Sequence, residues 1–222
     1  MPGLSVPAGH VGALEALARL RPRAFSSLKQ ALDVEVPKGR PDVVERAGGI
    51  FAKGTAAEAG QARALIDALT GLQSLRTWRD WSAAEVGELL GGSSSLKLTA
   101  DQRTTLASRV ATLLDLGAVR LLAKATDLLT EAANVYHAAR IVTDVRPVYG
   151  ATITETPVGA VIVHSLKVEH HTDGEVKSFH VAIETSDLKK LHEVVVRALD
   201  KASALESWIH ATGIQYLDVV GE

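Results

Sequence analysis

The apolar positions in roughly the first two-thirds of the chain recur at helical intervals. Val11, Leu14, Leu17 and Ala18 form one such stripe. Ser82 and Thr99 are each followed three residues later by Glu or Gln, which is the signature of a helix-starting capping box. The pattern predicts helices over residues 8–20, 22–32, 41–48, 56–69, 82–90, 99–114 and 118–139.

The period then changes from helical to alternating. Residues 141–149 form a candidate first strand, in which Pro147 marks an edge position or the end of the strand. Two further alternating runs flank Asp173-Gly174, a pair that suits a type I′ turn because both central residues need positive φ. We expect an α+β fold with an all-helical N-terminal domain over 1–140. A small antiparallel sheet packed with a long C-terminal helix follows over 141–222.

The predicted two-residue turn fixes how the second and third strands pair. If Thr172 lies opposite Glu175, the pairing places one set of apolar residues on a single face of the sheet. That set comprises Leu166, Val168, Phe179 and Val181. The opposite face is largely polar, and a one-residue slip would mix the two sets.

The C-terminal helix is predicted over 186–211, with Thr185 or Ser186 as its N-cap and Gly213 after its end. It would be about 39 Å long, whereas strands of nine to eleven residues span roughly 30–37 Å. A small sheet with one helix is also marginal alone. We therefore predict a helix seam that packs on a second chain; cover by the N-terminal helices is the alternative. The seam residues, spaced alternately by three and four, are Leu188, Leu191, Val195, Ala198, Ala202, Leu205 and Ile209. Residues 214–220 suggest a short extra strand or an ordered tail.

The sequence contains no strong motif for catalysis, phosphate binding or metal binding. There is no Gly-x-Ser-x-Gly elbow, and the Gly91-Gly-Ser-Ser-Ser stretch is expected to be a flexible loop rather than a phosphate-binding loop. The four histidines between 164 and 180 do not converge in the predicted register, so we expect a satisfied core His164 and no metal site. Trp78 and Trp81 are expected in the core, with a partner anchor as the alternative. We predict no catalytic residue, no cofactor and no metal.

Composition narrows the remaining classes of function. The net charge of −2 provides no basic field for nucleic acid, and the absence of cysteine excludes a disulfide framework. No apolar run approaches the ~20 residues of a membrane span. The first seven residues, Met-Pro-Gly-Leu-Ser-Val-Pro, lack the features of a signal peptide. These observations favour a cytoplasmic protein that binds neither nucleic acid nor a membrane interior.

The C-terminal third resembles a COMM domain. The matching pattern covers roughly Val142–Ser207, through the strand Asp144-Val-Arg-Pro-Val-Tyr149, the hairpin Val161–Ile183 and the helix that begins at Leu188-Lys-Lys-Leu191. The resemblance implies an obligate, intertwined dimer that serves as an assembly scaffold. Where the family usually has a tryptophan in the first strand, this chain offers Val145, Arg146 and Tyr149.

We therefore expect a non-enzymatic scaffold that dimerises through its C-terminal domain. Its partner would be a second copy or a related chain, and the helical domain would serve any further protein partners. The alternative is a small-molecule-binding or catalytic protein with a pocket between the two domains.

Overall fold

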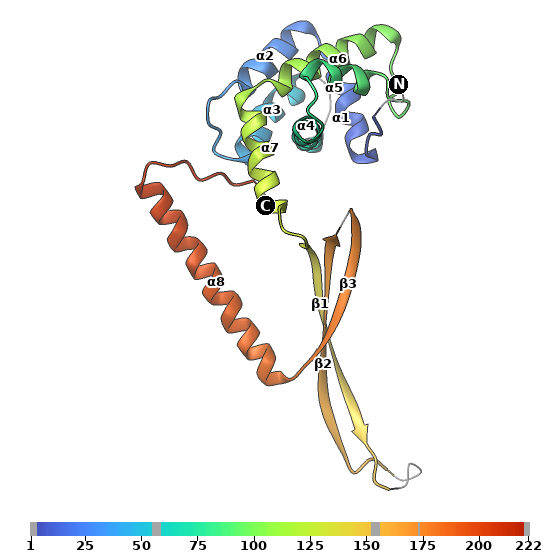
Figure 1. Cartoon of the computed structure of the whole chain (residues 1–222), viewed down its shortest axis with the longest axis vertical. Coiled ribbons are helices and arrows are strands. Elements are labelled where there is room, and N and C mark those ends of the chain that lie inside the picture. The colour runs from blue at the N-terminus through green and yellow to red at the C-terminus, as the bar shows by residue number, and fades with distance from the viewer. Residues whose placement is uncertain (1–3, 55–58, 152–155, 173, 220–222) are drawn as a thin grey trace. The chain divides into compact units, whose positions relative to one another are not determined.

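The computed structural model describes residues 4–54, 59–151, 156–172 and 174–219, and its architecture is α+β (Figure 1). The chain divides into two compact units. The helical unit comprises Met1–Leu129 together with Ile214–Glu222, and the α/β unit comprises Thr130–Gly213. The α/β unit is therefore inserted into the helical unit, with the C-terminal segment returning after it.

The described residues of the helical unit form seven helices. They are α1 (Ala8–Arg19), α2 (Pro22–Leu32), α3 (Arg40–Gly54), α4 (Ala59–Arg79), α5 (Ala83–Gly91), α6 (Ala100–Leu114) and α7 (Gly117–Thr130). Four of the seven predicted helices lie close to these bounds, whereas α3 continues six residues beyond the predicted end at 48 and α4 continues ten residues beyond 69. The seventh was predicted to reach residue 139, but α7 ends at Thr130 and a strand begins at Val135.

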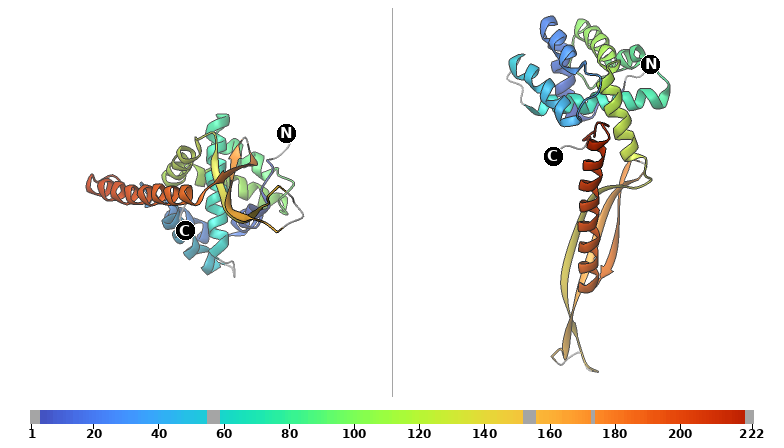
Figure 2. Two further views of the ribbon diagram at one scale, coloured as in Figure 1. Left: turned by 90° about the horizontal axis from the view of Figure 1, so that it is seen from below. Right: turned by 90° about the vertical axis from the view of Figure 1, so that its left-hand side faces the viewer.

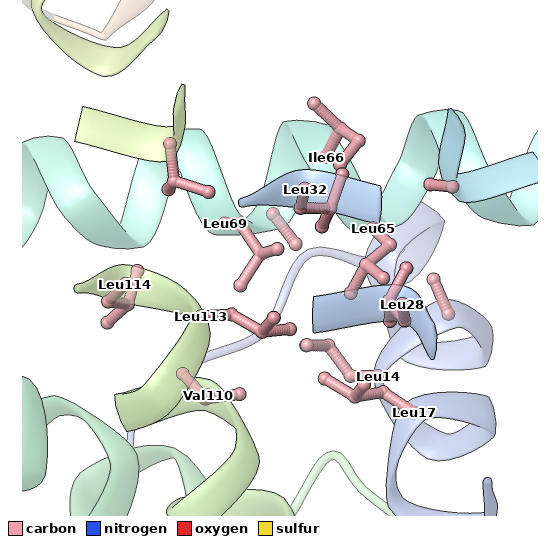
Figure 3. Close-up of a cluster of buried hydrophobic side chains, with 14 of the residues drawn as sticks. Leu14, Leu17, Leu28, Leu32, Leu65, Ile66, Leu69, Val110, Leu113 and Leu114 are labelled. Atoms are coloured by element: carbon pink, nitrogen blue, oxygen red, sulfur yellow. The ribbon is translucent and has the colours of Figure 1, made fainter. Parts of the chain in front are cut away.

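The apolar stripes of these helices meet in one core (Figure 3). Leu14 and Leu17 of α1, and Val110 and Leu113 of α6, have almost no exposed surface. Their neighbours come from α2 and α4. Of the stripe predicted on the first helix, Leu14, Leu17 and Ala18 are buried and Val11 is half-buried. The labelled core residues in Figure 3 are Leu14, Leu17, Leu28, Leu32, Leu65, Ile66, Leu69, Val110, Leu113 and Leu114.

Both predicted capping boxes are confirmed. At the start of α5, the backbone N–H of Ser82 donates to the Glu85 carboxylate over 2.6 Å, and the Glu85 N–H donates to the Ser82 hydroxyl over 3.2 Å. Thr99 and Gln102 exchange the same two bonds at α6. These bonds satisfy backbone donors that a helix start otherwise leaves unpaired.

The Gly91–Ser95 loop is not the flexible linker that its composition suggests. The Arg103 guanidinium of α6 donates to the carbonyl oxygens of Gly91 and Ser93 over 2.7 Å and to that of Leu96 over 2.8 Å. Ser93 is itself buried. The loop thus presents its carbonyls to a cation, which is the opposite of the N–H cradle that a phosphate needs.

The two tryptophans at the end of α4 lie in different environments. Asp80 has a φ of 54°, so the helix ends at Arg79 and the helical spacing between Trp78 and Trp81 is broken. Trp81 packs against the core, but Trp78 is 73% exposed, contrary to the expectation for it. The Arg79 guanidinium lies 4.3 Å from the centre of the Trp78 ring.

The C-terminal segment is ordered against the helical unit. The backbone N–H of Arg40 donates to the Asp218 carbonyl over 2.6 Å, and Gly39 forms a parallel bridge with Asp218. Gly39 has a φ of 146°, and a Cβ there would overlap the Asp218 backbone, so glycine is required at this position. Val219 completes the contact by entering the core.

The α/β unit contains a three-stranded antiparallel sheet and one helix. The strands are β1 (Val135–Val148), β2 (Gly159–Thr172) and β3 (Glu175–Ile183), in the order β1-β2-β3, and α8 (Thr185–Ala211) follows. The predicted register of β2 and β3 is confirmed from the pair Thr172 and Glu175 onward. Gly174 has the expected positive φ, whereas Asp173 lies outside the described residues.

Three local predictions about this unit are wrong. β1 begins six residues before the predicted start at Ile141, and its pairing with β2 shifts at a bulge around His137. The N-cap of α8 is Glu184, which forms a capping box with Asp187. β1 and β2 have 14 residues each, so they span about 46 Å. The two strands are therefore longer than α8, which spans roughly 40 Å, although the helix was predicted to be longer than the strands. Pro147 does lie on an edge strand and near its end.

Candidate interaction surface

The register of the three strands assigns their side chains to two faces. Residues opposite each other share a face, so Ile141 of β1 and Val181 of β3 lie on the same side as Leu166 of β2. We call this side the apolar sheet face. Its members are Ile141, Val145, Ile162, Leu166, Val168, Phe179, Val181 and Ile183.

The apolar sheet face is uncovered within one chain. Ile162 is 59% exposed and Phe179 is 49% exposed. Leu166 and Val168, on the central strand, are only half-buried although they have a strand on each side. Isolated apolar residues on a surface are ordinary, but a contiguous apolar patch marks a site of interaction.

Helix α8 carries the predicted seam, and this surface is uncovered as well. No residue of α8 is buried. Leu191, Val195 and Leu205 are between 39% and 58% exposed. Ala198 and Ala202 are exposed, while Leu188 and Ile209 are half-buried. Val194, Leu199 and Trp208 widen the seam, and each is more than 60% exposed.

The sheet and α8 meet at a histidine. His164 lies on the same face as Leu166, and it is the only buried polar residue among the described residues of the α/β unit. One ring nitrogen lies 2.8 Å from the Thr143 hydroxyl and the other 3.0 Å from the Thr185 hydroxyl. His164 thus joins β1, β2 and the first turn of α8, and both of its ring nitrogens have a hydroxyl within hydrogen-bond distance. Beyond this contact α8 diverges from the sheet (Figures 1 and 2).

The opposite face of the sheet is polar at its centre. Lys167 and Glu169 form an ion pair on β2, and the neighbouring Lys167 ammonium lowers the pKa of the Glu169 carboxyl. His137 and His171 lie edge to face, with their nearest ring nitrogens 3.2 Å apart. This pair was not predicted from the sequence, because residue 137 was expected to lie in a helix. Charged and paired groups of this kind suit a face that stays in water.

The contrast between the two units is the main feature of this surface. Every buried apolar side chain among the described residues belongs to the helical unit. The α/β unit has two extended apolar surfaces and, over the same described residues, no apolar core. A three-stranded sheet gains its stability from burial of one face, so this unit lacks the cover that it needs.

The described residues hold no group of three or more potential metal ligands.

Shifted pKa values in the described part of the chain have structural causes. Hydrogen bonds to Ser82 lower the pKa of Glu85, the Glu184 N–H lowers that of Asp187, and burial lowers that of Arg109. Within the described ranges, no helix combines the length and apolar character needed to cross a bilayer.

No family model matches this chain, and none of the curated proteins with which it was compared matches it either.

Proposed function

We propose that this protein is a non-enzymatic scaffold that dimerises through its α/β unit, in the manner of a COMM domain. The observation that carries the proposal is the absence of any buried apolar side chain among the described residues of that unit, beside two uncovered apolar surfaces. Exposed apolar area is costly in water, at roughly 25 cal/mol per Å². A partner that covers both surfaces removes this cost.

A second copy of the chain is the partner that fits best. The chain supplies an apolar sheet face and an apolar helix, α8, which is somewhat shorter than β1 and β2. Among the described residues of one chain, the sheet and the helix meet around His164 and Thr185. If α8 of each copy packs on the apolar sheet face of the other copy, two equivalent contacts form. Together they bury the sheet face and the helix of both chains. Such a closed two-fold exchange pairs each surface with its counterpart and does not propagate into a filament.

The polar residues on the opposite face of the sheet support a dimer contact on the apolar sheet face. The Lys167–Glu169 pair and Arg140 occupy it, and burying them would cost free energy unless each met a partner. The proposal therefore places the dimer contact on the side that holds Leu166 and Phe179. It leaves the helical unit, which has its own core, for other protein partners.

Substitutions that introduce charge into the helix seam test the proposed dimer contact. The double substitution Leu191→Asp and Val195→Asp puts two carboxylates where the partner's sheet is expected, and we expect it to abolish the dimer. Analytical ultracentrifugation measures the change. Circular dichroism should still report the folded helical unit, because none of its core residues is altered.

The matched control is Ala204→Asp with Ser207→Asp. Both residues are exposed on α8, and the helical period places them on the side away from Leu191. This pair adds the same charge to the same helix and should leave the dimer intact. A seam variant that is still dimeric, or a control variant that is equally disrupted, contradicts the assignment of the seam.

A further inference from the structure

A second site lies in the helical unit, far in sequence from the proposed dimer surface. A pocket of about 250 Å³ is enclosed by the segment before α1 and by α1, α4 and α5. Leu14, Ala68 and Leu90 form its floor and are all buried. Its remaining walls include Leu4, Leu72 and Leu75. An apolar cavity of about 150 Å³ is already large enough to hold benzene.

The pocket is built by ordered backbone. The N–H of Leu4 donates to the Leu89 carbonyl over 3.2 Å, which fixes the entering chain against the end of α5. Val6, two residues later, is buried. Gly71 of α4 lies exposed at the rim, and a Cβ built on it meets nothing within 4 Å. The missing side chain at Gly71 therefore leaves the mouth open.

Among the described residues of the lining, Ser5 and His10 carry the polar side chains. Ser5 lies just before α1 and His10 lies in its first turn, and His10 is the only titratable one of these described lining residues. The first turn of α1 contains no acidic residue, and its N-cap, Pro7, makes no side-chain cap. This end therefore offers a hydroxyl, an imidazole and a positive helix-dipole end, and the first turn of α1 adds no negative charge to it. It suits an anionic head, while the leucine walls suit an aliphatic body.

We propose that this pocket binds a small carboxylate amphiphile, a short-chain fatty acid, with its chain among the leucines and its carboxylate beside His10. The apolar cavity carries the proposal, and the charge of its polar end selects the head group. The site is independent of the α/β unit, so it goes beyond the scaffold function proposed above.

Isothermal titration calorimetry of the full chain with octanoate, below its micelle concentration, tests the site. A ligand of this size in a small apolar pocket is expected to bind with a Kd of about 0.1–1 mM. Octanol, which has the same chain without the charge, should bind at least about fivefold more weakly. If octanoate does not bind, or if octanol binds as tightly, the proposal is overturned.

Two glycine substitutions on α4 locate the binding. Gly71→Leu fills the mouth and should weaken octanoate binding at least about tenfold. Gly60→Leu makes the same change on the same helix, also at an exposed position with open space around it, and should leave binding unchanged. Equal binding by both variants would place octanoate elsewhere, for example on the exposed surfaces of the α/β unit, and would overturn the proposal.

His10→Leu tests the polar end. It should reduce octanoate binding and remove the preference over octanol, because the body of the pocket is unchanged. The seam variant Leu191→Asp with Val195→Asp should bind octanoate like the wild-type chain. Failure of the dimer proposal and failure of this one are therefore distinguishable.

Discussion

Single residues show how little space the helical unit leaves between α5 and α6. Gly87 of α5 faces α6 so closely that a Cβ would fall on the backbone carbonyl of Ala107. A Cβ on Gly91, one turn later, would lie 3.1 Å from the Arg103 carbonyl oxygen, which is a tight contact. Small residues one turn apart allow two helix backbones to approach, and the neighbouring Arg103 then reaches the carbonyls that follow α5.

Replacing Gly87 by alanine should therefore destabilise the chain. The added methyl group overlaps backbone, so α5 and α6 must separate, and we expect a loss of about 1–3 kcal/mol in the free energy of unfolding. Urea denaturation measures it. The control is Gly12→Ala on α1, where a Cβ meets nothing within 4 Å. There the better helix propensity of alanine should add up to about 1 kcal/mol. Equal effects of the two substitutions would contradict the close packing of α5 on α6.

Arg109 shows what residue patterns alone do not reveal. It lies on the core side of α6, beside Val110, where a helical stripe predicts an apolar residue. Its guanidinium donates to the carbonyls of Leu17, Ala18 and Leu20 over 2.6–3.0 Å and so satisfies the end of α1. Burial lowers the pKa of Arg109. Nothing local in the sequence indicates this role, because its partners lie about 90 positions away.

At the scale of elements, the start of α5 depends on an ionised capping residue. Hydrogen bonds from the backbone and hydroxyl of Ser82 hold the pKa of the Glu85 carboxyl below its usual value of 4.5. A pKa lowered by folding means that the ionised cap stabilises the folded state. This contribution is complete above pH 4.5 and is lost as the pH falls through the lowered pKa.

Glu85→Gln should accordingly lower the melting temperature at pH 7. The difference from the wild-type chain should shrink towards zero as the pH falls below 4.5, because the wild-type carboxyl is then neutral too. Calorimetry from pH 7 to pH 3 measures it. Glu88→Gln on the same helix leaves the cap intact and should show a smaller difference at pH 7. A difference for Glu85→Gln that does not depend on pH would contradict the role of the charge.

The elements that were predicted correctly are those with a strong local signal. The hairpin of β2 and β3 combines strict alternation with a glycine that adopts positive φ, so its register was predictable. The start of β1 was not, because Ala138, Ala139 and Arg140 favour a helix by propensity. Pairing with β2 overrides that preference. The bulge at His137 also interrupts the alternation that would have revealed the strand.

At the scale of the whole molecule, the two units differ in how they satisfy their apolar side chains. The helical unit buries its leucines within one chain, and even Val219 of the C-terminal segment returns to its core. The α/β unit leaves Phe179 and Trp208 in water. The seam and the apolar sheet face were predictable from period alone. The seam was also predicted to lack cover within one chain. How α8 lies against the sheet was not predictable, because it depends on contacts such as that between His164 and Thr185.

The molar mass of the full wild-type chain in solution tests the central claim most directly. One chain has a mass of 23.5 kDa, so a dimer has twice that value, 47 kDa. Light scattering coupled to size exclusion should give 47 kDa, and dilution through the micromolar range should not change it, because an intertwined dimer dissociates only by exposing both apolar surfaces. A folded chain that elutes with a mass of 23.5 kDa at every concentration would contradict the account.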